Sequence, residues 1–129
     1  MKKITICNKE CDIECNALTY VKYQSFFKSG ILKDMSIIET YLIKQNAYAN
    51  ELEKEEMSDS DRVSALSEML VNDIDEFIRI ITQITWILMY SANNKIDSYE
   101  NWLKSIDKFK IDDDWIVEVT EYAVDCFCK

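Results

Sequence analysis

Residues 74–92 read IDEFIRIITQITWILMYSA, and this stretch decides the fold of the chain. One apolar stripe follows the helical spacing i, i+3, i+4 and comprises Ile74, Phe77, Ile78, Ile81, Ile84, Thr85 and Leu88. A second set lies off that stripe and is also apolar, namely Ile80, Trp86, Ile87 and Met89. A helix that is apolar on several sides either lies in the middle of a bundle or offers its spare side to a partner.

The composition suits a helical domain built around that segment. A chain of 129 residues is long enough for one domain with one core, and an apolar content of 48% is typical of a globular protein. The chain has no proline, and Gly30 is its single glycine, which disfavours a β-rich fold with many turns. We therefore predict one mainly α domain over residues 1–129, with a β-hairpin in residues 1–16 and a helical bundle of about five helices in residues 17–129.

The beginning of the chain has the pattern of a hairpin. Ile4 and Ile6 share one face of the first predicted strand, and the next strand presents Cys11, Ile13 and Cys15 on one face. Asn8 tolerates the left-handed conformation of a tight turn, so the turn is predicted at residues 8–10. Because an isolated hairpin is marginal in water, we expect it to pack on the helices.

Two helices are predicted in the first half of the bundle. Asn16 is the expected N-cap of a short helix and Gly30 its expected C-terminal stop. The apolar side of this helix is expected to hold Leu18, Val21, Tyr23, Phe26 and Phe27. A longer helix is expected from about Leu32 to the charged residues 51–56, with an apolar stripe of Met35, Ile38, Tyr41, Leu42 and Ile43.

The second half contains the core helix and two more. Residues 57–61 are a predicted loop, in which Ser58 and Asp61 resemble a capping box. The next helix either continues unbroken into residues 74–92 or bends near residues 72–73. Asp97 or Ser98 is expected to cap a helix with Trp102, Leu103 and Ile106. Phe109 and Ile111 connect it to a final helix that starts at the acidic residues 112–114 and holds Trp115, Ile116, Val119, Tyr122, Ala123 and Phe127.

The charge of the chain excludes some classes of partner. A net charge of −9 disfavours nucleic acids and anionic membranes, because phosphate groups are bound by Lys and Arg. No apolar segment follows the basic start at residues 1–3, so no signal peptide is expected. The apolar run at residues 77–90 is interrupted by Arg79, Thr82 and Gln83 and is too short to span a bilayer. We expect a cytoplasmic protein.

The residues that most enzymes and metal sites need are scarce. The chain has no histidine, which removes the commonest general base and the Ser-His and Cys-His arrangements. Its five cysteines form no paired C-x-x-C motif, so reduced, partly buried thiols are the simpler interpretation and no metal or cofactor is predicted. We predict a protein that is not an enzyme and has no catalytic residues. A hydrolase that uses two carboxylates stays open, because sequence cannot show two acids meeting in a cleft.

Several short motifs, taken in order, resemble a known family. The chain reads ITICNKEC at residues 4–11, NALTYVKY at 16–23 and FKSGILKDM at 27–35. A helix with WILMYSA at residues 86–92 then leads to ENWL at 100–103. This order is similar to that of the tail assembly chaperones of long-tailed phages and prophages of Gram-positive bacteria. The match covers both ends of the chain, whereas residues 44–73 contribute little.

Two positions depart from the family pattern. Asn8 stands where the family hairpin has a glycine, and the glycine that follows Phe27 in the family is displaced here to Gly30. These differences put the geometry of the two turns in doubt.

The resemblance implies a function in phage assembly. Such chaperones bind the long, helical, aggregation-prone tape measure protein until the tail tube polymerises around it. They act in the host bacterial cytoplasm, are absent from the mature virion, and often exist also as a longer form made by a ribosomal frameshift. The resemblance therefore implies the tape measure protein, and a frameshifted longer form of the chain itself, as partners; a homo-oligomer is left open.

The apolar residues outside the main stripe are the candidate contacts for such a partner. These partner-binding residues are Trp86, Met89, Trp102, Leu103, Trp115 and Phe127, because large apolar and aromatic side chains anchor interfaces. A core position is the alternative for each of them. Two rival functions stay open: an acidic phage inhibitor that mimics nucleic acid and blocks a host defence protein, and a structural component of the tail.

Overall fold

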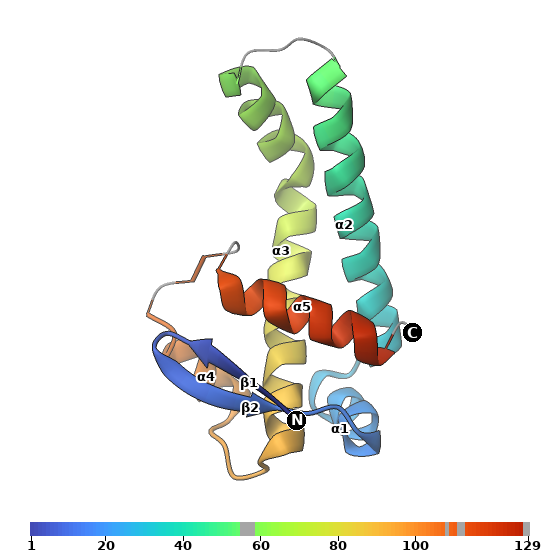
Figure 1. Cartoon of the computed structure of the whole chain (residues 1–129). Coiled ribbons are helices and arrows are strands. Elements are labelled where there is room, and N and C mark those ends of the chain that lie inside the picture. The colour runs from blue at the N-terminus through green and yellow to red at the C-terminus, as the bar shows by residue number, and fades with distance from the viewer. Residues whose placement is uncertain (55–58, 108, 111–112, 128–129) are drawn as a thin grey trace.

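The protein is a helical bundle with an N-terminal β-hairpin, as the sequence predicts (Figure 1). The computed structural model describes residues 1–54, 59–107, 109–110 and 113–127, and the side chains of residues 1–43, 74–107, 109–110 and 113–127. Its elements are β1 (Lys2–Ile6), β2 (Lys9–Ile13), α1 (Ala17–Phe27), α2 (Ile31–Lys54), α3 (Asp59–Ala92), α4 (Tyr99–Lys104) and α5 (Asp114–Phe127).

Helix α3 is the centre of the molecule. It contacts α1, α2, α4, α5 and β2, and from Ile80 to Met89 every side chain is buried except the half-buried Gln83, while Arg79 is exposed. The buried side chains come from both predicted sets: Phe77, Ile80, Ile81, Ile84, Trp86, Ile87, Leu88 and Met89, while Ile74 and Ile78 are half-buried. The hydroxyls of Thr82 and Thr85 donate to the carbonyls of Ile78 (2.8 Å) and Ile81 (2.7 Å), so these polar groups are satisfied in the core. Of the two alternatives for this helix, the middle of a bundle is confirmed.

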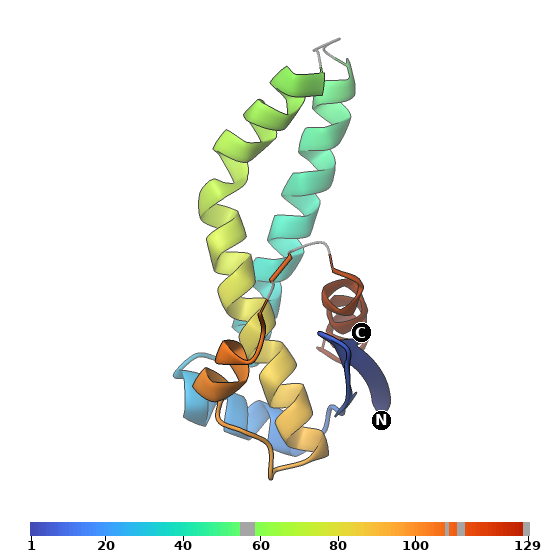
Figure 2. The ribbon, with the colours of Figure 1, turned by 90° about the vertical axis from the view of Figure 1, so that its left-hand side faces the viewer.

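Helices α2 and α3 are antiparallel, and the ends near residues 54 and 59 extend beyond the rest of the molecule (Figures 1 and 2). The unbroken course of α3 from Asp59 decides between the two predictions for residues 72–73. Met35, Ile38 and Tyr41 of α2 are buried as predicted, and Tyr41 stacks on Phe77 at 4.8 Å between ring centroids. Ile43 was expected in the same stripe but is 69% exposed, because it lies on the other side of the helix. The predicted cap at Ser58 lies outside the described residues.

The hairpin packs its isoleucines against the helices. Its strands pair antiparallel, with Ile6 opposite Lys9 and Ile4 opposite Cys11, and Ile4, Ile6 and Ile13 are buried. The predicted turn at residues 8–10 is wrong by one position: Cys7 (φ 51°) and Asn8 (φ 67°) form it. Two consecutive left-handed residues match the right-handed twist of the strands and close the hairpin with a two-residue turn. Beyond β2, the backbone N–H of Glu14 donates to the carbonyl of Leu88 (3.1 Å) and joins the hairpin to α3.

Helix α1 begins as predicted but buries a different face. The Asn16 side chain accepts from the N–H of Leu18 (3.0 Å), and the N–H of Asn16 donates to the Thr19 hydroxyl (3.1 Å), which completes a capping box. The buried residues are Thr19 and Tyr23, whereas Leu18 (40%), Val21 (68%) and Phe26 (48%) are exposed. The prediction for this face was wrong except at Tyr23 and the half-buried Phe27. Thr19 lies inside because its hydroxyl also hydrogen-bonds that of Ser91 at 2.6 Å.

The turn between α1 and α2 uses a lysine where the sequence predicted the glycine. Lys28 adopts the left-handed conformation (φ 58°, ψ 25°), and its N–H donates to the carbonyl of Gln24 at 2.9 Å. Gly30 has no positive φ, and a Cβ added there would meet nothing within 4 Å. The prediction that Gly30 stops α1 was therefore wrong, because the left-handed cap comes two residues earlier.

These conformations predict opposite roles for the two residues. Lys28→Gly removes the Cβ penalty of a left-handed residue and should raise the free energy of unfolding by about 0.5–1 kcal/mol. Gly30→Ala restricts the unfolded chain at no cost in the fold and should be neutral or stabilising by about 0.5 kcal/mol. Urea unfolding followed by circular dichroism measures both. A loss of more than about 1 kcal/mol in Gly30→Ala would contradict the assignment.

The last two helices pack against α3 on different sides. Ser98 caps α4, since its hydroxyl accepts from the N–H of Asn101 at 3.3 Å, so Ser98 rather than Asp97 is the cap. Helix α5 lies beside the hairpin and contacts β1, α2 and α3 (Figures 1 and 2). It buries Trp115, Ile116, Val119 and Ala123 as predicted, while Tyr122 and Phe127 are half-buried. The predicted connector residue Ile111 and the acid at 112 lie outside the described residues.

A buried carboxylate joins the first three helices. Asp34 of α2 is 1% exposed and accepts hydrogen bonds from the hydroxyls of Tyr23 (2.5 Å) and Ser29 (3.0 Å). The Tyr23 hydroxyl also lies 3.2 Å from the amide oxygen of Gln83 in α3. Burial, followed by the hydrogen bond to Asp34, raises the pKa of Tyr23 well above its ordinary value. Tyr23 is therefore a neutral donor that links α1 to α2 and α3.

The raised pKa of Tyr23 predicts instability in alkali. The folded state keeps the phenol protonated, whereas the unfolded chain ionises it above about pH 10. Its contribution to stability is present below that pH and is lost as the pH rises, by about 1.4 kcal/mol per pH unit. Tyr23→Phe should lower stability at neutral pH, because Asp34 loses a donor, and should flatten the alkaline slope by that amount. Urea unfolding between about pH 8 and 11 measures the slope, and an unchanged slope in Tyr23→Phe would contradict the assignment.

Candidate functional site

Two hollows open along α3 and meet at Tyr99, the first residue of α4. The first has a volume of about 410 Å³ and is lined by Phe26, Phe27, Trp86, Tyr90, Ile96 and Tyr99, with Asp97, Ser98 and Glu100 at the same site. The second has a volume of about 480 Å³ and is lined by Ile78, Thr82, Tyr99, Leu103, Ile106 and Phe109, with Asp75 and Arg79. We call the two hollows together the aromatic groove.

The aromatic rings of the first hollow hold one another in place. Phe26 packs edge-on against Trp86 (5.0 Å between ring centroids) and Tyr90 (5.4 Å), and Trp86 and Tyr90 stack at 5.3 Å. Phe27 meets Tyr99 edge-on at 5.0 Å. These separations and angles are those of favourable aromatic pairs. The wall of the hollow is therefore formed in advance, while Phe26 stays half exposed.

Two hydrogen bonds fix the far wall of the groove. The indole N–H of Trp86 donates to the carbonyl of Asp97 (2.9 Å) and holds the loop between α3 and α4. The hydroxyls of Tyr99 and Thr82 lie 2.8 Å apart, and since Thr82 already donates to Ile78, Tyr99 is the donor. Burial raises the pKa of Tyr99, so the phenol stays neutral at physiological pH. The centre of the groove is uncharged, and charge is found at its margins.

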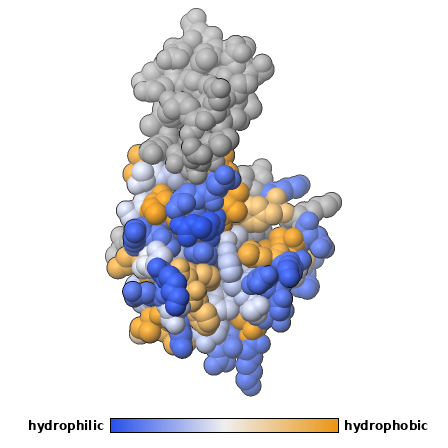
Figure 3. All heavy atoms as spheres, turned by 180° about the vertical axis from the view of Figure 1, so that it is seen from behind, coloured by the Kyte–Doolittle hydropathy of each residue, from blue (hydrophilic) through white to orange (hydrophobic). Residues whose placement is uncertain are grey.

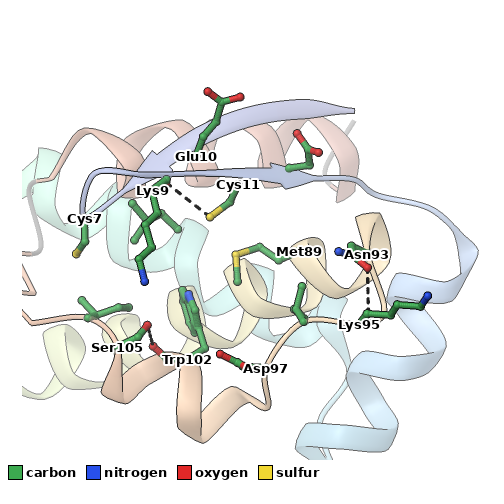
Figure 4. A pocket seen from close by; sticks show the side chains of 14 residues that line it. Cys7, Lys9, Glu10, Cys11, Met89, Asn93, Lys95, Asp97, Trp102 and Ser105 are labelled. Carbon is green, nitrogen blue, oxygen red and sulfur yellow. Dashed lines mark hydrogen bonds between the residues drawn. The ribbon is translucent and has the colours of Figure 1, made fainter.

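A separate cleft lies on the other side of α4, below β2 (Figure 4). Its volume is about 490 Å³. The consecutive residues of β2 from Lys9 to Asp12 form one side, and Met89, Ile96, Trp102 and Ile106 contribute the apolar part of the other. Lys9 and Cys11 point from β2 towards Trp102 and Met89 in Figure 4. We call this the β2 cleft.

The structure brings four of the six predicted partner-binding residues to the surroundings of α4. Trp86 forms the back of the first hollow, and Leu103 lines the second. Met89 and Trp102 line the β2 cleft. Leu103 is half-buried, whereas the side chains of Trp86, Met89 and Trp102 are buried, with 4% to 9% of their surface exposed. They form walls and floors of the hollows rather than a protruding surface.

The remaining two predicted residues lie elsewhere. Trp115 is buried and packs edge-on against Phe109 at 6.1 Å between ring centroids. Phe127 is half-buried and meets Tyr20 edge-on at 5.2 Å, at the junction of α5 with α1. Trp115 therefore belongs to the core under α5, and Phe127 lies outside the groove and the cleft.

The sequence prediction missed three aromatic residues of the groove, of which Phe26 is exposed and the other two are half-buried. Phe26, Tyr90 and Tyr99 line the first hollow but were placed in the core or in no site. A stripe at helical spacing marks the apolar side of a helix without saying how completely another element covers it. One feature of the sequence could have indicated an accessible aromatic residue here. Phe26 and Phe27 are adjacent, so one face of a helix cannot bury both side chains fully.

The described part of the chain contains neither a cluster of metal ligands nor a helix suited to cross a membrane. Within it, the structure has no group of three or more Cys, Asp or Glu residues placed to hold a metal ion. Cys7, Cys11, Cys15 and Cys126 are free thiols, and burial raises the pKa of Cys11 and Cys15. Among the same residues, no helix combines the length and the apolar character that crossing a membrane requires.

The chain matches no protein-family model, no curated protein and no solved structure. The chemistry of the groove and the sequence resemblance are therefore the grounds for its function.

The burial of the tryptophans predicts how each candidate responds to truncation. Trp102→Ala and Trp115→Ala should each lower the free energy of unfolding by about 3 kcal/mol or more, since each leaves a large cavity. Leu103→Ala, at a half-buried position in the same helix as Trp102, should cost about 1–2 kcal/mol. Chemical denaturation measures all three. If Trp115→Ala were as stable as the parent chain, Trp115 would be a surface residue rather than part of the core under α5.

Proposed function

We propose that the chain is a phage tail assembly chaperone, a non-enzymatic protein that covers apolar helical segments of the tape measure protein. The observation that carries the proposal is the aromatic groove: two mainly apolar hollows beside α3 that share Tyr99, with a wall of packed aromatic rings. Its residues overlap the stretch at 86–103 that resembles the chaperone family. The identity of the partner, the tape measure protein, is inferred from that resemblance.

The dimensions of the groove suit a helix. Its lining follows α3 from Ile78 to Tyr90, a distance of about 18 Å at the helical rise of 1.5 Å per residue. That is the length of about three turns, which presents apolar anchors at i, i+3 or i+4, and i+7 to a hydrophobic groove. The two hollows on either side of Tyr99 each have room for one large side chain of such a partner.

The charge of the chain suits a chaperone that must remain dispersed. A net charge of −9 keeps copies of the complex apart while the groove covers apolar surface that would otherwise aggregate. Binding by the groove would bury apolar area and therefore tolerate salt. The proposal includes action in the host bacterial cytoplasm and absence from the finished virion, as the resemblance implies.

The test is co-expression with the tape measure protein of the same genome, followed by affinity capture at about 0.1 M and about 1 M salt. We expect soluble tape measure protein to be recovered at both salt concentrations. Phe26→Ser removes a half-exposed anchor of the groove and should lower recovery about tenfold. Val21→Ser is the matched control, because Val21 is an exposed apolar residue of the same helix that does not line the groove.

Other outcomes would assign a different function. Equal loss of recovery in Phe26→Ser and Val21→Ser would remove the groove from the proposal. An insoluble tape measure protein under both conditions would favour the acidic inhibitor, whose binding to a basic target collapses as salt rises. Detection of the chain in purified particles would favour a structural tail component.

A further inference from the structure

The free edge of β2 borders the β2 cleft. Strand β1 covers one edge of β2, and the sheet has no third strand among the described residues. The cleft is lined by Lys9, Glu10, Cys11 and Asp12 in succession, although neighbouring side chains of a strand point to opposite faces. A hollow that touches four consecutive residues of a strand follows its edge, and Figure 4 shows β2 between β1 and the cleft.

The hairpin register identifies the backbone groups at that edge. The residues that flank a two-residue turn bond to each other, so Ile6–Lys9 and Ile4–Cys11 are the hydrogen-bonded pairs. Glu10 and Asp12 alternate with them and direct their N–H and C=O groups away from β1. Neither residue has a backbone hydrogen bond to another element within the described part of the chain. The edge therefore presents two donors and two acceptors to the cleft.

We propose that this edge binds an extended segment of another protein, whose side chains alternate between apolar and basic residues. Such a segment adds a strand to the hairpin through its main chain, and its side chains supply the specificity. This inference is independent of the aromatic groove and of the tail assembly function, because it concerns an extended partner on the opposite side of α4.

The different chemistry of the two faces of β2 determines why the bound segment should alternate apolar and basic residues. Side chains on the inner face of the added strand would lie beside Cys11 and above Met89 and Trp102, where the cleft is apolar. Lys9 lies on the same face and lines the cleft with its methylene chain. The outer face holds Glu10 and Asp12, and among the ion pairs of the described residues Lys3 is the one basic partner of this pair, at 3.2 Å from Glu10. One negative charge is left over, and cross-strand pairing of opposite charges favours lysine or arginine there.

A second copy of the chain fits the edge poorly. Pairing of β2 with β2 would place Glu10 and Asp12 beside the same acids of the other copy, which is unfavourable. Strand β1 has the required alternation, but its Ile4 and Ile6 are 2% and 3% exposed in their own core. They could enter the cleft of another copy only after the hairpin had left its own fold.

The size of the cleft limits the length of the bound segment. A volume of about 490 Å³ holds the inward side chains of a few residues, and β2 itself has five. A blocked hexapeptide that alternates lysine and valine is therefore the probe. In a titration followed by nuclear magnetic resonance, the amide N–H groups of Glu10 and Asp12 should shift and those of Ile4 and Cys11 should change little. At about 80% occupancy, hydrogen exchange at Glu10 and Asp12 should slow about fivefold.

Three comparisons decide the result. The same peptide N-methylated at every lysine and valine loses its backbone donors in either strand direction, and binding as strong as that of the parent peptide would overturn strand addition. The double variant Glu10→Lys/Asp12→Lys should lose affinity about tenfold for the lysine peptide and gain it for a glutamate–valine peptide. Glu39→Lys/Glu121→Lys is the matched control, with the same change of charge at exposed positions outside the cleft, and should bind as the parent chain does. An equal loss in the control, or a dimer of the chain that the peptide dissociates, would overturn the proposal.

Discussion

The need to cover α3 around most of its circumference organises the whole molecule. Between Ile80 and Met89 every side chain of this helix is buried except the half-buried Gln83, and a single partner helix can cover only one face. Helices α1, α2, α4 and α5 and the hairpin strand β2 all contact it, so each is placed by the side of α3 that it covers. The hairpin, which would be marginal alone, is stable because it is one of these covers.

The covering is uneven, and the candidate binding surfaces lie where it is thinnest. Helix α4 has six residues, and a helix this short cannot cover as much of α3 as α2 does. Hollows remain on both of its sides: the aromatic groove towards α1, and the β2 cleft towards the hairpin. Trp86, Met89 and Trp102 thus serve as core residues whose outer edges line the candidate binding surfaces.

Polar residues inside the core join the helices. They also make the buried face of a helix hard to predict from its hydropathy pattern. Asp34 and Thr19 are both buried, and each is satisfied by hydrogen bonds to other elements or to the backbone. A satisfied polar group can be buried at little cost. The face of α1 with Thr19 and Tyr23 therefore packs inside, while the more apolar Leu18 and Val21 face solvent, and a hydropathy pattern alone selects the wrong face.

The sequence by itself determined the class of fold and the central element. Local sequence is enough to predict three features: the helix at 74–92 from its apolar spacing, the first strands from their alternation, and the helix caps at Asn16 and Ser98. Each depends on residues that are neighbours in the chain. Tertiary structure alone decided which apolar residues remain accessible: Phe26, Tyr90 and Tyr99 meet from three separate segments, and the open edge of β2 faces a cleft closed by α4. The accessibility of a side chain depends on which other elements cover it, and this cannot be predicted from the type of side chain or from its spacing along the chain.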